Sequence, residues 1–396
     1  MRVTAALARL GTETAFDVLA RAVALAESGR SIVNLGIGQP DFPTPGHIVE
    51  AAVKALRDGH HGYTPANGIL PLREAVARDL LKRRGVEVDP GRIVVVPGGK
   101  VTMFFAVLMF GEPGAEILYP DPGFPIYRSL IEYTGATPVP IPLHEELGFA
   151  FRAEEVLERI TPRTRLLILN SPANPTGGVV PKAELDSLVA GLLRHPEVAV
   201  LSDEIYARMC YDGLEHASLL AYPELEDRLI LLDGWSKTYA MTGWRIGYGV
   251  WPAALVDHAV RLAVNCHSCV HHATQWAAIA ALEGPQEESE RMVREFDRRR
   301  RLIVRLLNQL PGISCVMPKG AFYAFANIAA TGLRAVELQD RLLEEEGVAA
   351  IAGTSFGLFG EGYLRFSYAA STEAIEEAAS RMRRFLERCG VEKQSG

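Results

Sequence analysis

The stretch RLILLDGWSKTYAMTGWRIGYG, Arg228–Gly249, is the most informative part of this sequence. It begins with an apolar run that predicts a buried strand and ends at Asp233. Small and polar residues follow at once, and Lys237 stands among them. Because a continuous apolar run without alternation is typical of a strand buried on both faces, this stretch favours a parallel sheet covered by helices.

Four earlier apolar runs repeat this pattern. They predict strands over Arg92–Gly98, Ala115–Pro120, Arg165–Asn170 and Val198–Asp203. In an open α/β sheet, functional groups gather beyond the carboxyl ends of the strands. We therefore expect a functional site from the segments that follow the five strands: Pro97–Lys100, Asp121–Phe124, Asn170–Asn174, Asp203–Tyr206 and Asp233–Lys237.

The pattern changes after about residue 285, where the charged amphipathic helix Glu287–Leu310 is predicted. A shorter series of strands and helices follows, to a last helix over Thr372–Cys389. We predict an α/β fold with a large domain, residues 40–285, whose mostly parallel sheet is flanked by helices. Residues 1–39 and 286–396 are predicted to form a smaller α/β domain. A length of 396 residues agrees with this division, since single cores stop growing near ~250–300 residues.

Composition excludes several classes of protein. The net charge is −7, which argues against a dedicated nucleic-acid binder. The basic run Arg298–Arg301 follows an acidic run, so we expect a solvated helix face there. No apolar stretch approaches the ~20 residues of a membrane helix, and no signal peptide is recognised. Five cysteines do not suggest a disulfide scaffold, and we expect a cytoplasmic protein.

The residues around Lys237 indicate a particular chemistry. A lysine among Trp235, Tyr239 and Met241 is expected to be desolvated, which lowers its pKa and makes its amine a nucleophile. Arg245 lies between two glycines, where the backbone can approach an anion closely. An activated lysine beside a phosphate-binding arginine suits pyridoxal 5'-phosphate, an electron sink that a lysine holds as a Schiff base.

Other predicted strand ends supply what this cofactor needs. Asp203 can pair with a pyridinium nitrogen, and Asn174 and Tyr206 can hydrogen-bond a phenolate oxygen. Phe124 can stack on a flat ring. The planar fork of Arg365 matches a carboxylate. In addition, the PGGK segment begins a helix, whose first N–H groups bind anions.

Eight motifs in order resemble one family. The chain is similar to the class I aminotransferases of fold type I, the aspartate, alanine and aromatic aminotransferase group. The resemblance covers about Ala15–Leu386 and rests on GQPDF (38–42), YTPANG (63–68), PGGK (97–100), PDPGFPIY (120–127), NSPANPTG (170–177), SDEIY (202–206), SKTYAMTGWRIGY (236–248) and YLRFSYA (363–369).

The resemblance implies a function for each matching position. Lys237 would be the Schiff-base lysine, which also moves the proton between substrate and cofactor. The implied contacts to the cofactor ring are Phe124, Asn174, Asp203 and Tyr206. The implied phosphate ligands are Ser236, Arg245, the backbone of Gly99 and Lys100, and Tyr63 of the neighbouring subunit of a homodimer. The substrate α-carboxylate would bind Arg365, with Asn174 and Gly38 beside it.

The implied activity is transfer of an amino group between an L-amino acid and a 2-oxo acid by a ping-pong mechanism. A carbon–sulfur β-lyase or a biosynthetic enzyme acting on an unusual amino acid remains an alternative on the same scaffold. A regulatory protein without turnover is a third, disfavoured because Lys237, Asp203 and Arg365 are all present. No metal site is expected, although Cys266–His272 contains a Cys-x-x-Cys pair and three histidines.

The sequence leaves the substrate side chain open. An acidic substrate requires a further cation, and the candidates are Lys100, Arg128, His267 or a residue of a partner subunit. An apolar substrate requires an apolar wall, for which the candidates are Ile37, Phe124, Phe356 and Phe359. Two positions depart from the family pattern: Gly234 stands where some relatives have serine, and Trp235 is unusually large, which we expect to reflect packing.

Overall fold

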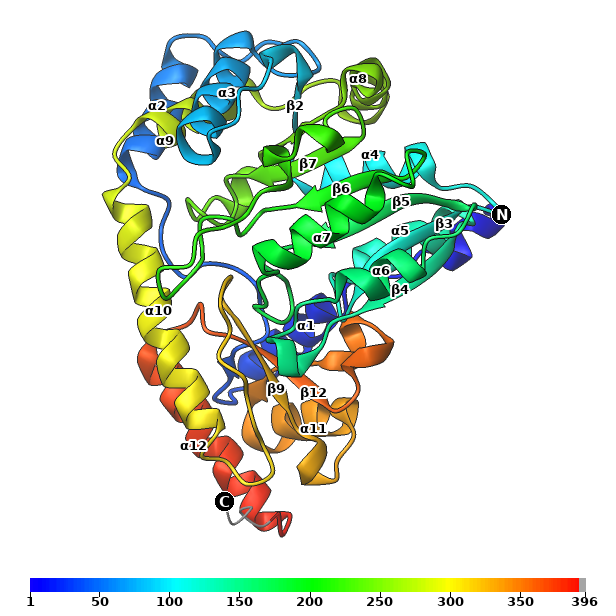
Figure 1. The fold of residues 1–396 in the computed structure, drawn as a ribbon. Helices are drawn as coiled ribbons and strands as arrows, with labels where there is room; N and C mark the ends of the chain where they lie inside the picture. Colours follow the sequence, from blue (N-terminus) through cyan, green and yellow to red (C-terminus); the bar gives the residue numbers. More distant parts are fainter. Residues whose placement is uncertain (392–396) are drawn as a thin grey trace.

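The computed structural model describes residues 1–391 and has an α/β architecture (Figure 1). Its largest sheet has seven strands in the order β2-β8-β7-β6-β5-β3-β4. Only β8 runs antiparallel to its neighbours, so the prediction of a mostly parallel sheet is confirmed. The strands are β2 (Ile93–Val96), β3 (Glu116–Asp121), β4 (Thr137–Pro142), β5 (Thr164–Asn170), β6 (Ala199–Asp203), β7 (Leu229–Gly234) and β8 (Gly247–Val250).

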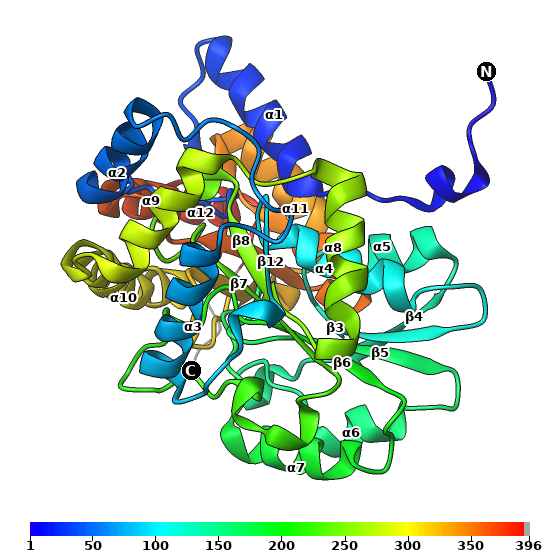
Figure 2. The ribbon, with the colours of Figure 1, turned by 90° about the horizontal axis from the view of Figure 1, so that it is seen from above.

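The central strands are buried on both faces, because successive residues pack against different helices. Along β5, Leu166 and Ile168 belong to one apolar cluster, and Leu167 and Leu169 belong to another. Figures 1 and 2 show the two helical layers that complete these clusters. They are α4 (Lys100–Phe110), α5 (Ile126–Thr134) and α8 (Ala253–His267) on one side, and α6 (Ala153–Glu158) and α7 (Lys182–Leu192) on the other.

Three more helices cover the end of the sheet formed by β2 and β8. Residues of these helices join Val95 and Tyr248 in a third apolar cluster. Trp235 is part of that cluster, and its indole N–H donates to the carbonyl of Ala278 at 3.1 Å. Its bulk therefore serves packing, as expected. The helices are α2 (Gly46–Arg57), α3 (Leu70–Arg84) and α9 (His272–Glu283).

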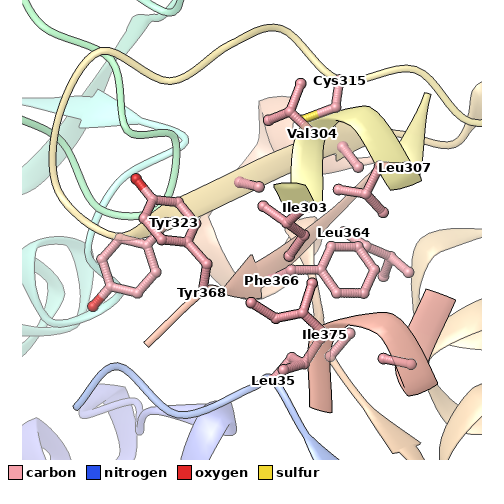
Figure 3. Packing of buried hydrophobic residues seen from close by; sticks show 14 of the residues in the cluster. Leu35, Ile303, Val304, Leu307, Cys315, Tyr323, Leu364, Phe366, Tyr368 and Ile375 are labelled. Carbon is pink, nitrogen blue, oxygen red and sulfur yellow. The ribbon is translucent and has the colours of Figure 1, made fainter. Parts of the chain in front are cut away.

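A second sheet, in the order β11-β12-β9, lies with the helices of the C-terminal part. Figure 3 shows its apolar packing, where Ile303, Leu364, Phe366 and Ile375 meet Leu35 from the N-terminal part. The elements are α1 (Thr14–Glu27), β1 (Val33–Asn34), α10 (Glu287–Leu307), β9 (Tyr323–Asn327), α11 (Ala335–Arg341), β10 (Val348–Ala349), β11 (Ile351–Ala352), β12 (Tyr363–Ser367) and α12 (Thr372–Arg388).

The N-terminal and C-terminal parts of the chain meet in this region, since β1 pairs with β10 in parallel. This pairing agrees with a unit built from both termini. The domain boundaries after residues 39 and 285 stay a prediction.

In the large sheet the structure differs from expectation in two strands, and one helix face of the C-terminal part also differs. The sequence analysis missed β4, which contains three prolines and lies at the sheet edge, where a residue without an N–H is tolerated. It also missed the glycine-rich β8. The solvated face predicted for Arg298–Arg301 is wrong for two of its residues. Arg299 and Arg300 are buried, and they form ion pairs with Asp41 and Asp212 respectively. Both carboxylates belong to loops far away in the sequence, so the helix pattern alone does not reveal them.

None of the helices within residues 1–391 has the combination of length and apolarity that crossing a bilayer requires.

Candidate functional site

A cavity of about 500 Å³ lies at the carboxyl-terminal edge of the large sheet. It is lined by the segments after β2, β3, β5, β6 and β7, together with residues of the N-terminal part and of β9, β11 and β12. Of the predicted site residues, eleven line this cavity: Gly38, Gly99, Lys100, Phe124, Asn174, Asp203, Tyr206, Ser236, Lys237, Arg245 and Arg365. Tyr63 does not, and its side chain is 92% exposed.

Lys237 lies on the loop that connects β7 to β8. Its Nζ donates a hydrogen bond to the carbonyl of Gly38 at 2.7 Å and lies 5.9 Å from the ring centre of Tyr206. Desolvation of the amine, reinforced by the charges of Arg365 and Arg245, lowers the pKa of Lys237 to about 8. With this pKa, roughly a tenth of the amine is uncharged at pH 7 and the share grows as pH rises, and the uncharged form is the nucleophile.

Asp203, the last residue of β6, is buried and accepts a hydrogen bond of 2.6 Å from the Tyr127 hydroxyl. Burial raises the pKa of Asp203 to about 6, although the Tyr127 hydrogen bond opposes the rise. A positive charge beside the carboxyl would favour its ionised form. The carboxylate thus suits a positively charged partner at the floor of the cavity.

Sequence reasoning assigned no role to Tyr127 or Asn170, although Asn170 begins one of the segments expected at the site. Tyr127 lies on α5, three residues after Phe124, and only the folded chain brings its hydroxyl to Asp203. Asn170 donates to the carbonyl of Asp203 at 3.0 Å and accepts from the N–H of Asn174 at 2.9 Å. It therefore ties the end of β5 to the end of β6. Its position as a polar residue at the end of a strand is the feature of the sequence that could have indicated this role.

A buried ion cluster lies behind Asp203. The Arg84 guanidinium, at the end of α3, contacts the carboxylates of Glu204 and Asp233. His216 also contacts Glu204, at 2.8 Å. Because Glu204 follows β6 and Asp233 lies on β7, this cluster fastens together the two strand ends that carry Asp203 and the Lys237 loop.

Arg365 projects from β12 and is buried without a salt bridge among residues 1–391. One of its terminal nitrogens donates to Asn174 Oδ1 at 2.9 Å, and the other donates to the carbonyl of Gly36. Its Nε has no partner in the described part of the chain. A buried cation in this state requires an anion, so Arg365 forms one end of an anion-binding cavity.

The opposite end of the cavity is a second place for an anion. Arg245 adopts a left-handed backbone conformation, with φ 53°, and such strain in a non-glycine residue is typical of functional sites. A Cβ on Gly98 would lie 2.3 Å from Arg245 Nη2, so the glycine leaves room for the guanidinium in this position. The eleven-residue helix α4 begins at Lys100, and its N-terminal N–H groups favour an anion beside Arg245.

Aromatic side chains enclose the space between these ends. The hydroxyls of Tyr206 and Tyr323 hydrogen-bond at 2.7 Å, and Tyr323 also stacks 4.6 Å from the Arg365 guanidinium. Tyr323 was not predicted, because nothing in its strand signals a contact with residues more than 100 positions away. On the other side, Phe124 lies 5.2 Å from Lys100 Nζ.

Of the cations considered for an acidic side chain, Lys100 lines the cavity, and Arg128 and His267 do not. Ile37, Phe124 and Phe356 line it also, whereas Phe359 does not. Within residues 1–391, no three His, Cys, Asp or Glu side chains are grouped as a metal would require.

Comparison with known proteins places the chain in a family. The family described as aminotransferase class I and II matches residues 30–382. An aromatic-amino-acid aminotransferase 2 of Thermococcus litoralis is 40% identical, covering 91% of this chain and 93% of its own length. An aspartate aminotransferase of Pyrococcus abyssi is 39% identical, with 91% and 93% covered.

A solved structure agrees with these relatives. The aspartate aminotransferase from Rhizobium meliloti superposes with a TM-score of 0.93 at 33% identity, covering 98% of this chain and 99% of that one. Since the family match covers residues 30–382 and the relatives match over most of their own length, the chain belongs to the class I and II aminotransferases and is an enzyme that transfers amino groups.

Proposed function

We propose that Lys237 holds pyridoxal 5'-phosphate, and that the enzyme moves an amino group between an L-amino acid and a 2-oxo acid in two half-reactions. The observation that carries the proposal is the amine of Lys237, desolvated to a pKa of about 8 inside the cavity. It faces a space with one anion-binding end at Arg245 and another at Arg365.

The residues present fit this cofactor on chemical grounds. Arg245, Ser236 and the start of α4 supply cationic and N–H groups for a phosphate. Asp203 supplies a buried carboxylate that becomes fully ionised beside a pyridinium nitrogen. Asn174 and Tyr206 supply hydrogen-bonding groups for the phenolate oxygen. The buried Nε of Arg365, without a partner in residues 1–391, remains for the substrate's α-carboxylate.

Pyridoxal phosphate, when bound, supplies an aldehyde carbon and an aromatic ring that accepts an electron pair from the substrate's Cα. The protein's residues do the remaining work. The uncharged amine of Lys237 takes the proton from Cα and returns it as a general acid. Asp203 holds positive charge at the far side of the ring, and Arg365 orients the substrate so that Cα faces Lys237.

We further propose that the substrates include acidic amino acids, with Lys100 binding the distal carboxylate. Lys100 is the candidate cation that lines the cavity, and aspartate is the substrate named for the Pyrococcus relative. Aromatic side chains are a second proposed class. Ile37, Phe124 and Phe356 provide an apolar wall, and the Thermococcus relative is named for aromatic amino acids.

We also propose that the active unit is a homodimer in which Tyr63 reaches the neighbouring active site. The 92% exposure of a tyrosine on a loop near α2 and α9 supports this proposal. Large aromatic side chains are enriched at interfaces and seldom fully exposed.

The proposal is tested by supplying aspartate, with pyridoxal phosphate present, first alone and then with 2-oxoglutarate. Aspartate alone is expected to give no more than one equivalent of oxaloacetate per site and no ammonia. Addition of 2-oxoglutarate should start continuous formation of glutamate. Steady release of ammonia from aspartate alone would contradict the proposed transfer chemistry.

A further inference from the structure

The N-terminal segment runs along the cavity and is held by ion pairs or hydrogen bonds on both sides of it. On one side, Arg9 donates to the carbonyl of Glu132 at 2.8 Å, at the end of α5. On the other, Arg21 pairs with Asp340 of α11 at 2.7 Å. Between Arg9 and Arg21, residues 13–16 line the cavity. In Figure 2 this N-terminal segment extends from α1 toward α5.

Glu13 is the acidic residue among residues 13–16, and it forms an ion pair with Lys100. The side chain of Glu13 is 16% exposed and that of Lys100 is 44% exposed, so the pair lies at the boundary between cavity and solvent. Lys100 Nζ also lies over Phe124, 5.2 Å from the ring centre. The carboxylate of Glu13 is therefore already paired with the ammonium group that an acidic substrate would bind.

The cofactor and the substrate's α-carboxylate are ligands for every other cation that lines the cavity, but not for the pair of Glu13 and Lys100. In the proposed function, Lys237, Arg245 and Arg365 each have a partner in the cofactor or the substrate's α-carboxylate. Lys100 and Glu13 remain, and they neutralise each other. A distal carboxylate that binds Lys100 must compete with Glu13 for its ammonium group, whereas an apolar side chain can enter with the pair intact.

We propose that Glu13 is a specificity-determining residue that competes with the substrate's distal carboxylate for Lys100. This inference rests on the proposed function, in which Lys100 recognises acidic substrates. The competition has two consequences. Acidic substrates bind more weakly than Lys100 alone would allow, and apolar substrates meet a neutral pair in place of an unpaired cation, whose partial desolvation by the substrate would cost free energy.

The test measures binding to the holoenzyme by calorimetry, with succinate as the dicarboxylate probe and 3-phenylpropionate as the apolar one. Glu13→Gln should tighten succinate binding by about 3- to 10-fold, the range expected for loss of a partly exposed ionic competitor. It should change 3-phenylpropionate binding by less than about twofold. Asp17→Asn removes an exposed charge from the same helix and should affect neither ligand.

Lys100→Met separates the two proposals. It should weaken succinate binding about 10-fold or more, and adding Glu13→Gln to it should have no further effect. If Lys100→Met leaves succinate binding unchanged, both the acidic-substrate proposal and the competition are wrong. If Lys100→Met weakens succinate binding but Glu13→Gln does not tighten it, the competition alone is wrong. Equal effects of Glu13→Gln on both ligands would also overturn the competition, since they would indicate a general loosening of the N-terminal segment.

Discussion

The amine of Lys237 can act as a nucleophile because it is desolvated and lies close to other cations. Three positive side chains share one cavity with it: Lys100, Arg245 and Arg365. Their repulsion and the loss of water both favour the uncharged amine. The same cations attract a phosphate and a carboxylate, so the cavity that activates Lys237 also binds the groups that it must act on.

Replacing Lys237 with alanine should abolish turnover, because no other amine is placed to hold the cofactor or move the Cα proton. We expect kcat to fall by at least about 10⁴-fold, the upper range for general acid–base catalysis. Steady-state assay with aspartate and 2-oxoglutarate checks this expectation, and folding is checked by thermal unfolding. A Lys237→Ala enzyme with near-normal turnover would rule out the proposed function of Lys237.

The hydroxyl of Tyr127 is expected to keep Asp203 ionised. It donates the 2.6 Å hydrogen bond that lowers the pKa of Asp203. Tyr127→Phe should raise that pKa and weaken pyridoxal phosphate binding by about 10-fold, as for the loss of one hydrogen bond to a charged group. Fluorescence titration of the apoenzyme measures the effect, and it should grow as pH is lowered from 8 to 6. Unchanged affinity at both pH values would show that Tyr127 serves packing alone.

Arg365→Lys should weaken substrate binding more than it slows the chemical step. A lysine keeps the charge but loses the planar fork that holds Asn174 and a carboxylate together. We expect KM for aspartate to rise about 10- to 100-fold, the range for loss of charge-assisted hydrogen bonds. If KM stays within about twofold of the wild-type value, the α-carboxylate binds elsewhere.

At the scale of elements, the ends of β6 and β7 depend on the charge of Arg84. Arg84→Met would leave Glu204 and Asp233 buried beside each other, so we expect the free energy of unfolding to fall by about 3–5 kcal/mol. Arg78→Met, on the same helix, breaks the exposed pair with Glu283 and should cost less than about 1 kcal/mol. Urea unfolding of both variants measures the difference, and equal losses would contradict a special role for the Arg84 cluster.

The same cluster predicts a pH dependence. Burial opposes ionisation of Glu204, but Arg84 and His216 outweigh it and lower its pKa to about 2, below the roughly 4.3 of an unfolded glutamate. Because the folded pKa is the lower one, the stabilisation is complete above about pH 4.3 and is lost as pH falls toward 2. Glu204→Gln should remove this part of the acid sensitivity, as unfolding curves at pH 5 and pH 3 would show. An identical acid sensitivity in both proteins would contradict the assignment.

The sequence predicted the elements whose signal is local and missed those that depend on distant partners. The apolar strands β2, β3, β5, β6 and β7 were found because both of their faces are buried. The strand β4 carries prolines that only an edge position permits, and β8 needs glycines because a Cβ on Gly247 would lie 2.4 Å from the Gly99 nitrogen. No local pattern reveals either requirement.

The same reason separates the site residues that were predicted from those that were not. Lys237, Asp203 and Asn174 stand at strand ends, where the α/β topology places functional groups. Tyr323 contacts Tyr206 across 117 positions and Glu13 contacts Lys100 across 87 positions, and only the folded chain brings them to the cavity. Their contacts cannot be inferred from spacing along one segment.

At the scale of the whole molecule, the exposed position of Tyr63 predicts a shared active site. Co-expressed Lys237→Ala and Tyr63→Ala chains should form hybrid dimers with one intact site, which takes Lys237 from one chain and Tyr63 from the other. Purified hybrids should therefore recover about half of the wild-type activity, by this count of one intact site in two. Activity no higher than that of the parent variants would place Tyr63 in its own subunit's site or outside any site.

The most direct measurement is borohydride reduction of the enzyme with pyridoxal phosphate, followed by peptide mass mapping. We predict that reduction fixes the cofactor on Lys237 alone. Incubation with aspartate before reduction should prevent the labelling, because the amino group has moved to the cofactor, and addition of 2-oxoglutarate should restore it. Labelling of another lysine, or labelling of Lys237 that aspartate does not change, would contradict an aminotransferase that works through Lys237.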